Sequence, residues 1–483
     1  MKFPFSRVSI LSWFVFLAVT QTFTVGCQNK IEVETGNLEM VVVVMRHGVR
    51  SPGFPPFHKE HVDRPRAKYW SRDKRWPDFG VARNQLTLHG YNLVERLGAY
   101  YRTLYLGRTE LLSKKDCPVA SRIYVRADNC TRDVETAEAF LKGFMPDCRV
   151  PVHHFPVDTK RWDPLFYGLD LINTCTLTEA ARRKAIKGRI GTMPDLIRAY
   201  RKPLQKIQDV LGCCSPEACP TGDVSRCTLF DIPSGLRRNG DFFGTFFVGH
   251  EAAEAFMLEA AQGFPRKDIG WGRVSNKHLL KMLKVHLAYY DVLFRTPLLA
   301  RKEGSNLLAH ILVSIQQRLD GMTISGLARA EPKGRPPTPE TRFLLYVAHD
   351  VTLDSLAGLL DLHWHNRSFL PDHTPPGGGI VLEVYRDAGF PPNQSRTWIT
   401  ASFLTQTLDQ MAESKNLSPA SPPSRSTIPL AAFSKAKFPQ KGCSYHAFRQ
   451  VVLEALDMDC VEPALRPCIT EQNPNRHIRT AGE

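Results

Sequence analysis

The feature that most constrains the fold is the segment EMVVVVM at positions 39–45, which ends abruptly at the charged pair Arg46 and His47. Its β-branched residues show no apolar and polar alternation, so it predicts a strand buried on both faces, as in a helix-covered parallel sheet. A second apolar run, FLLYVA at 343–348, ends in the same way at His349 and Asp350. Open α/β sheets bind ligands at the carboxyl ends of their strands, so we expect these polar groups at one edge.

Helical periodicity follows the first run over 90–108 and 132–143, which indicates crossover helices. Helical patterns then dominate 177–207, 249–262 and 278–301. We therefore expect an α/β fold with a mostly parallel central sheet flanked by helices and an inserted, mainly α-helical lobe. The expected domains are a discontinuous α/β domain over 37–165 and 290–483, and a helical domain over 166–289. The segment 416–437 is rich in proline and serine, which favours a surface loop.

The amino terminus has the pattern of an export signal, with Lys2 and Arg7 ahead of an apolar run over 8–20. We expect a signal peptide over 1–26, with a buried helix as the alternative. Cys27 closes the string TVGC, which is similar to a lipobox, so lipidation at Cys27 and simple cleavage nearby both stay open. No later segment has the roughly 18 uninterrupted apolar residues of a membrane span, so no transmembrane segment is expected. We expect a periplasmic or secreted protein.

Export also decides how the 12 cysteines are interpreted, because disulfides form in oxidising compartments. The group at 213, 214, 219 and 227 fits no standard zinc spacing and indicates local disulfides. The formal net charge of +15 favours anionic substrates. Nucleic acid is not expected as a partner, since no basic run interleaved with aromatic residues is present.

The string RHGVRSP at 46–52 places two arginines around one histidine. A guanidinium fork matches phosphate oxygens and stays charged. The arginines disfavour the imidazolium form of His47, which leaves a neutral nitrogen able to attack phosphorus. An isolated Arg-His pair is usually a surface pair, and an Asp after a strand is often a helix cap. The combination of both strand ends is what points to catalysis.

This string resembles the signature of the histidine acid phosphatases, and His349 with Asp350 is similar to the distal pair of that family. The string RADNCTR at 126–132 resembles the segment that carries a third phosphate-binding arginine. DPLF at 163–166, GWGR at 270–273 and DHTPPGG at 372–378 resemble the bacterial periplasmic branch, which includes phytases and glucose-1-phosphatase. The resemblance covers residues 39–460.

The resemblance implies a phosphoric monoester hydrolase with His47 as the nucleophile and Asp350 as the proton donor to the leaving oxygen. The groups that it implies for binding the phosphoryl group are Arg46, Arg50, Arg132 and His349. These groups neutralise the transferring charge, so neither a metal nor another cofactor is expected. The resemblance also implies disulfides between Cys117 and Cys148 and between Cys175 and Cys460.

Two other functions compete with this interpretation. A mutase on the same fold is disfavoured by the export signal, and a non-catalytic phosphate-binding protein is disfavoured because His47 and Asp350 are both present. The substrate is expected to be a small phosphate ester. Where phytases of the branch have Thr and Lys after the signature proline, this chain has Gly53 and Phe54, and Glu303 aligns with a rim arginine. We therefore expect a general or sugar-phosphate phosphatase, with a phytase as the alternative.

Overall fold

The structure is a computed structural model, and it describes residues 36–53, 76–106, 111–112, 122–157, 162–169, 171–213, 227–330, 336–387, 396–430 and 442–470. The expected signal peptide over 1–26 and Cys27 lie outside the described residues, as do Phe54, Cys117, Cys214 and Cys219.

The central sheet has the strand order β10-β8-β7-β1-β6-β2-β3, with β9 paired to β8. Parallel pairing joins β1 (Gly36–Arg46), β6 (Phe343–Ala348), β2 (Ile123–Ala127) and β3 (Val152–His153). Antiparallel pairing extends the sheet from β1 through β7 (Gly379–Asp387) and β8 (Thr397–Thr405) to β9 (Ser424–Ile428) and β10 (Cys443–Ser444). The expected α/β fold is confirmed, and both predicted apolar strands lie side by side in its parallel part.

Strand β1 is buried on both faces, as its unbroken apolar sequence predicts. Met40, Val42 and Val44 pack into one apolar core, and Val41, Val43 and Met45 pack into another on the opposite face. Successive side chains of a strand point to opposite sides of the sheet, so both faces need cover. Apolar burial contributes about 25 cal/mol per Å², so this double burial fixes the register of β1.

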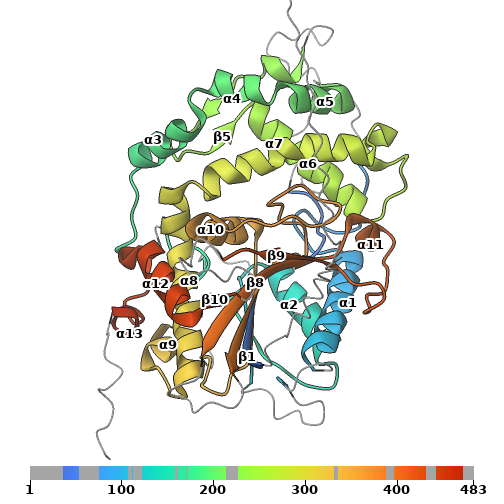
Figure 1. Cartoon of the computed structure of the whole chain (residues 1–483). Coiled ribbons are helices and arrows are strands. Elements are labelled where there is room, and N and C mark those ends of the chain that lie inside the picture. The colour runs from blue at the N-terminus through green and yellow to red at the C-terminus, as the bar shows by residue number, and fades with distance from the viewer. Residues whose placement is uncertain are drawn as a thin grey trace, which may run out of the picture. The chain divides into compact units, whose positions relative to one another are not determined.

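Helices cover the two faces (Figure 1). On one side lie α1 (Leu88–Tyr105) and α2 (Thr131–Phe144). On the other lie α8 (Pro297–Asp320), α9 (Ser325–Ala330) and α12 (Tyr445–Ala455). Helix α10 (Asp350–Leu360) follows β6 directly and packs into the same core as α8, while α11 (Leu408–Ala412) and α13 (Arg466–Thr470) are short. The predicted crossover helices at 90–108 and 132–143 are confirmed within a few residues.

Beyond the sheet, five helices form a group that packs around a third apolar core, to which α1, α8 and α11 also contribute (Figure 1). They are α3 (Glu179–Ile190), α4 (Met193–Ala199), α5 (Arg201–Leu211), α6 (Thr245–Ala261) and α7 (Asn276–Phe294). The helical pattern over 278–301 falls on two helices, because α7 ends at Phe294 and Pro297 begins α8 at its first position. The domain bounds 166–289 and 290–483 stay predictions.

The expectation of a loop throughout 416–437 was wrong for one segment. Residues 424–428 form strand β9, antiparallel to β8, with Ser424 opposite Thr405 and Ile428 opposite Ala401. Composition misled here because backbone pairing with an available strand edge does not require an apolar sequence. Residues 431–437 lie outside the described residues.

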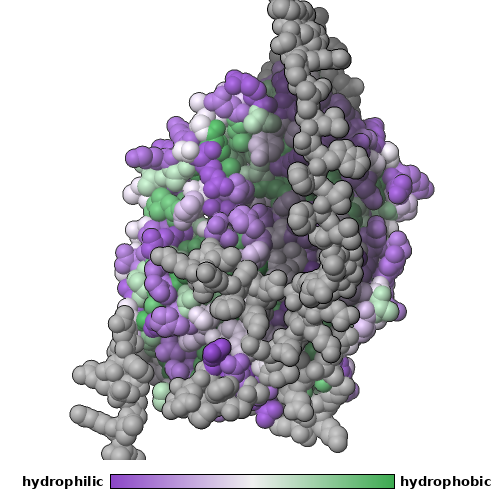
Figure 2. All heavy atoms as spheres, in the orientation of Figure 1, coloured by the Kyte–Doolittle hydropathy of each residue, from purple (hydrophilic) through white to green (hydrophobic). Residues whose placement is uncertain are grey.

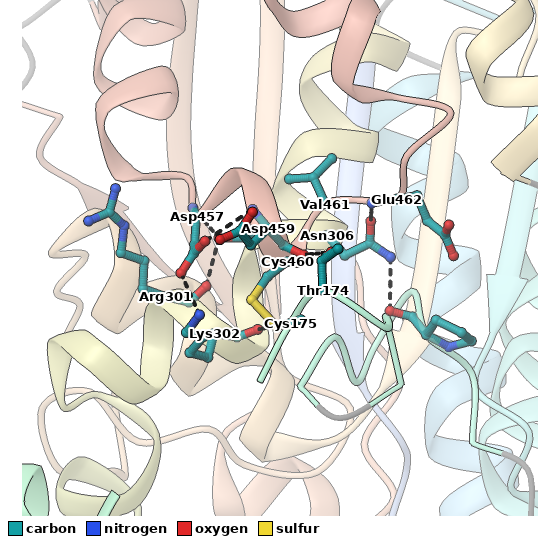
Figure 3. Close-up of a disulfide and its surroundings, with 12 residues drawn as sticks. Thr174, Cys175, Arg301, Lys302, Asn306, Asp457, Asp459, Cys460, Val461 and Glu462 are labelled. Atoms are coloured by element: carbon teal, nitrogen blue, oxygen red, sulfur yellow. Dashed lines mark hydrogen bonds and ion pairs between the residues drawn. A yellow bond between two sulfur atoms is a disulfide. The ribbon is translucent and has the colours of Figure 1, made fainter. Parts of the chain in front are cut away.

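A disulfide joins Cys175, just before α3, to Cys460 in the carboxyl-terminal part (Figure 3). This confirms the expected pair. Around it, Lys302 Nζ lies 2.9 Å from Asp457 Oδ2, and Asn306 Nδ2 donates to Pro164 O at 2.9 Å. Cys148 is also disulfide-bonded. These contacts hold α8 between segments that are distant in sequence.

The described surface is mixed, and in the view of Figure 2 hydrophilic side chains alternate with hydrophobic patches. Among the described helices, none combines the length and the apolar character needed to cross a membrane.

The fully buried Glu259 on α6 makes stability depend on pH. Burial raises its pKa to about 8, although the bond that Glu259 accepts from the Gly270 N–H lowers it. In the unfolded chain Glu259 ionises near pH 4.5, so the free energy of unfolding falls by about 1.4 kcal/mol per pH unit between that pH and about 8.

We expect Glu259→Gln to raise the melting temperature at pH 7 and to leave it unchanged near pH 4, because glutamine keeps the acceptor for Gly270 and removes the ionisation. Thermal unfolding followed by circular dichroism at both pH values measures this. An equal shift at the two pH values would show that ionisation of Glu259 is not the cause.

Candidate active site

The site lies at the carboxyl ends of β1 and β6, where Arg46 pairs in register with Ala348. The residues that follow each strand are therefore neighbours. The His47 N–H donates to Ala348 O at 2.9 Å, and the imidazole centroids of His47 and His349 are 5.5 Å apart. The expectation that both strands deliver polar groups to one edge of the sheet is confirmed.

The backbone around His47 is fixed on two sides. Gly377 N–H donates to His47 O at 2.9 Å, and Gly48 N–H donates to Thr136 Oγ1 of α2 at 3.1 Å. Gly48 has no room for a side chain, since an added Cβ would lie 2.8 Å from Val94 Cγ2 on α1. This close approach of α1 explains the glycine after His47.

The imidazole of His47 presents Nε2 as its lone-pair nitrogen. Its Nδ1 lies 2.9 Å from Gly48 O, and because a carbonyl only accepts, Nδ1 carries the hydrogen. Burial, together with the nearby Arg132 and Arg46, holds the pKa of His47 well below its usual value. A neutral imidazole with a free nitrogen is a nucleophile that needs no separate base.

Arg46 is fully buried, and its guanidinium is held by three segments. It donates to Glu254 on α6 and to Thr374 O at 2.8 Å, and its Nη2 lies 2.8 Å from Asp350 Oδ2. Arg50 Nη2 lies 3.2 Å from both carboxylate oxygens of Glu254. One carboxylate therefore orients both arginines of the string at 46–52.

Glu254 is ionised despite its burial. Burial alone would raise its pKa, and Arg50 and Arg46 together lower the pKa well below its usual range. The sequence analysis missed Glu254. The available signal was weak, because α6 carries three glutamates, and sequence alone does not show which of them meets an arginine, although 15 of its 17 residues are buried. Its partner Arg46 is 208 residues away in sequence, and no spacing rule connects them.

Arg132 and His349 line the other side of the site. Arg132 Nη2 lies 3.2 Å from His349 Nδ1, and His349 Nε2 lies 2.8 Å from Asp128 Oδ2. Burial opposes the charged form of His349, but Asp133 and the bond to Asp128 raise its pKa to about 9. His349 is thus an imidazolium at neutral and acidic pH, which adds a cation and a donor to the site.

Asp350 is the first residue of α10 and lies between the two strand ends. Its Oδ1 accepts from the Val351 N–H at 2.9 Å, and its Oδ2 faces Arg46. All six residues predicted for the site are therefore brought together: Arg46, His47, Arg50, Arg132, His349 and Asp350.

A pocket of about 340 Å³ opens onto these groups. His47, Arg50, Arg132, His349 and Asp350 form its polar wall. The rest of the pocket lining includes Glu303 and four aromatic residues: Trp162, Phe166, Tyr167 and Phe294. The pocket lining thus combines cationic groups with aromatic side chains and one further acidic group.

This arrangement defines a class. Three guanidinium groups and an imidazolium surround a neutral histidine with a free nitrogen and a carboxyl group beside it, which is suited to phosphoryl transfer. In agreement, the family model of the histidine phosphatase superfamily (branch 2) matches residues 37–187 and 227–403. The chain belongs to this family, and it is a phosphoric monoester hydrolase of the histidine acid phosphatase type.

Individual relatives cover most of the chain. It is 32% identical to phytase AppA of Escherichia coli, over 86% of this chain and 92% of that protein. It is 24% identical to a glucose-1-phosphatase of Providencia rettgeri, over 87% and 92% of the two chains. Among solved structures, a phytase from Citrobacter braakii superposes with a TM-score of 0.74 at 30% identity, covering 89% of this chain and 100% of that one.

We expect Glu254→Gln to lower kcat/KM by about 10- to 100-fold, because a charge-assisted pair contributes roughly 1.5–3 kcal/mol and glutamine holds Arg46 and Arg50 less firmly. Steady-state kinetics with an aryl phosphate measures this, and circular dichroism checks folding. Glu251→Gln, on the same helix, is the control and keeps the wild-type rate. A full kcat/KM in a folded Glu254→Gln enzyme would rule out a functional role for this carboxylate.

Proposed function

We propose that this protein is a metal-independent phosphatase that hydrolyses phosphate monoesters through a phosphohistidine at His47. The observation that carries the proposal is the protonation and bonding of His47. Its Nδ1 donates a hydrogen bond to Gly48 O, and its Nε2 is unprotonated and lies near arginines. An attacking nitrogen and a cationic cradle for the phosphoryl oxygens are the two parts that this chemistry needs.

In the proposed first step, His47 Nε2 attacks phosphorus, the P–N bond forms and the P–O bond to the leaving group breaks. Asp350 donates its proton to the leaving oxygen, and Arg46, Arg50, Arg132 and His349 balance the phosphoryl charge. In the second step a water molecule attacks phosphorus and gives a proton back to Asp350. The P–N bond then breaks, which releases phosphate and neutral His47.

We expect His47→Ala to lower kcat by at least about 10⁴-fold while the protein stays folded, because no other nucleophile replaces Nε2. Rapid acid quenching with a phosphorus-labelled substrate should trap an acid-labile, base-stable phosphate on wild-type His47. His365→Ala, which changes an exposed histidine, serves as the control and traps as much as wild type. Recovery of phosphoserine, or of no covalent species, would contradict the mechanism.

The pocket lining supports small phosphate monoesters, including sugar phosphates, as the preferred substrates. Glu303 in the lining repels a polyanion such as inositol hexakisphosphate, and the aromatic residues offer flat apolar faces to a sugar or aryl group. The alternative is that Arg237 or Arg238 of the helical group compensates for this charge. Neither is part of this pocket lining, and Arg238 is paired with Glu179 at the exposed surface.

The alternative substrate is inositol hexakisphosphate, which the similarity to phytases favours. A non-catalytic phosphate-binding role is the alternative from another class, and the retained His47 and Asp350 count against it. We also propose export, with residues 1–26 as the signal peptide and Cys27 as the alternative point of lipidation.

We expect kcat/KM to be higher for glucose 1-phosphate and aryl phosphates than for inositol hexakisphosphate. Glu303→Gln should raise kcat/KM for the hexakisphosphate by about tenfold, since removal of one repulsive charge is worth roughly 1.4 kcal/mol, and should leave the aryl phosphate rate nearly unchanged. Purified mature enzyme at acidic pH is the material to use. A tenfold wild-type preference for the hexakisphosphate would identify the protein as a phytase.

A further inference from the structure

Four metal-ligating side chains converge at the His349 ring, and the three besides His349 lie outside the pocket lining. Their donor atoms all lie within 4.8 Å of one another. We propose that they form a binding site for a zinc-class divalent cation: Asp128, Cys130, Asp133 and His349. The site is an addition to the phosphatase chemistry, which does not require it.

The two nitrogens of the His349 ring have different nearest partners. Nδ1 faces Arg132 at 3.2 Å, and both residues line the pocket. Nε2 lies 2.8 Å from Asp128 Oδ2 and 3.5 Å from both Asp133 Oδ2 and Arg132 Nη2. Asp128, Cys130 and Asp133 are not part of the pocket lining. A cation on Nε2 leaves Nδ1 directed toward the substrate.

Asp133 is the strongest sign that the site holds a ligand. Its side chain is fully buried, and neither carboxylate oxygen has a hydrogen-bond partner among the described residues. Its nearest cationic atoms are His349 Nε2 at 3.5 Å and Arg132 Nε at 3.9 Å. A buried carboxylate without hydrogen bonds is costly, so an atom that fills its coordination is favoured.

Cys130 supplies the preference for a soft cation. It is the N-cap residue of α2, where Ser, Thr, Asp or Asn normally accepts a backbone hydrogen bond, yet its side chain makes no capping bond. The thiol is not in a disulfide and contacts His349 instead. Thiolate and imidazole together with carboxylates are ligands that zinc and cadmium accept and magnesium does not favour.

Binding replaces protons by the cation without any redox change. The N–H bond at His349 Nε2 and the S–H bond of Cys130 break, as does the O–H bond of Asp133 where that carboxyl is protonated. These protons leave, and the cation bonds to the freed nitrogen and sulfur and to one oxygen of each aspartate. Zinc bonds of about 2.0–2.3 Å place tetrahedral ligands roughly 3.3–3.8 Å apart, so the four side chains need to close in by about 1 Å. The resulting −1 charge faces Arg132.

Another group within the described residues, Glu254, His286 and Asp350, also has ligand atoms within 4.8 Å. It is the weaker candidate, because it has no thiol and Arg46 already contacts both carboxylates.

The test uses full-length mature enzyme treated with EDTA and dialysed. Titration with Cd²⁺ should give the ultraviolet charge-transfer band of a cadmium–thiolate bond, and calorimetry with Zn²⁺ should give one site. Cys130→Ser should abolish the band and weaken Zn²⁺ binding by at least about 100-fold, with Cys130→Ala as a second variant. Mg²⁺ should not compete.

His363→Gln is the matched control, because His363 contacts Asp361 and Asp372 in an exposed group that offers zinc similar atoms. This variant should keep both the band and the affinity. Unchanged binding by Cys130→Ser, or the absence of binding by wild type, would overturn the proposal. Turnover of the EDTA-treated enzyme tests the metal-independent mechanism separately, and Cys130→Ser should retain it.

Discussion

The buried guanidinium of Arg46 is the interaction on which the site depends. It is carried by β1, and its partners come from α6, from α10 and from the segment before β7. A charge removed from water is stable only when its partners are in place, and loss of one partner of such a group typically costs 3–5 kcal/mol. The sheet and the helical group must therefore be docked before the phosphoryl pocket exists.

The same network sets opposite charge states on two neighbouring histidines. His47 lies among arginines and stays neutral, whereas His349 has two aspartates behind it and stays charged. Their ring centroids are only 5.5 Å apart. One histidine is thus prepared to attack and the other to bind an anion, and the difference comes from the second layer of side chains around each ring.

Much of this was predictable from sequence because the decisive residues directly follow strands. Two unbroken apolar runs predicted β1 and β6, and residues adjacent to those runs gave His47 and His349. The sequence did not predict the positioning roles of Glu254, Asp128 and Asp133, because these roles arise from contacts between segments far apart in sequence. Strand β9 was not predicted, because its formation depends on pairing with the edge of β8.

The Cys175–Cys460 disulfide closes a covalent ring around most of the enzyme, with a sequence separation of 285. Helices α6 and α10 lie inside that ring. They carry Glu254 and Asp350, the two carboxylates that contact Arg46. A protease that cuts one surface loop within it leaves the two fragments tethered, and the buried contacts of Arg46 can hold them in place. A single cut within the ring therefore gives two fragments that separate only after the disulfide is reduced.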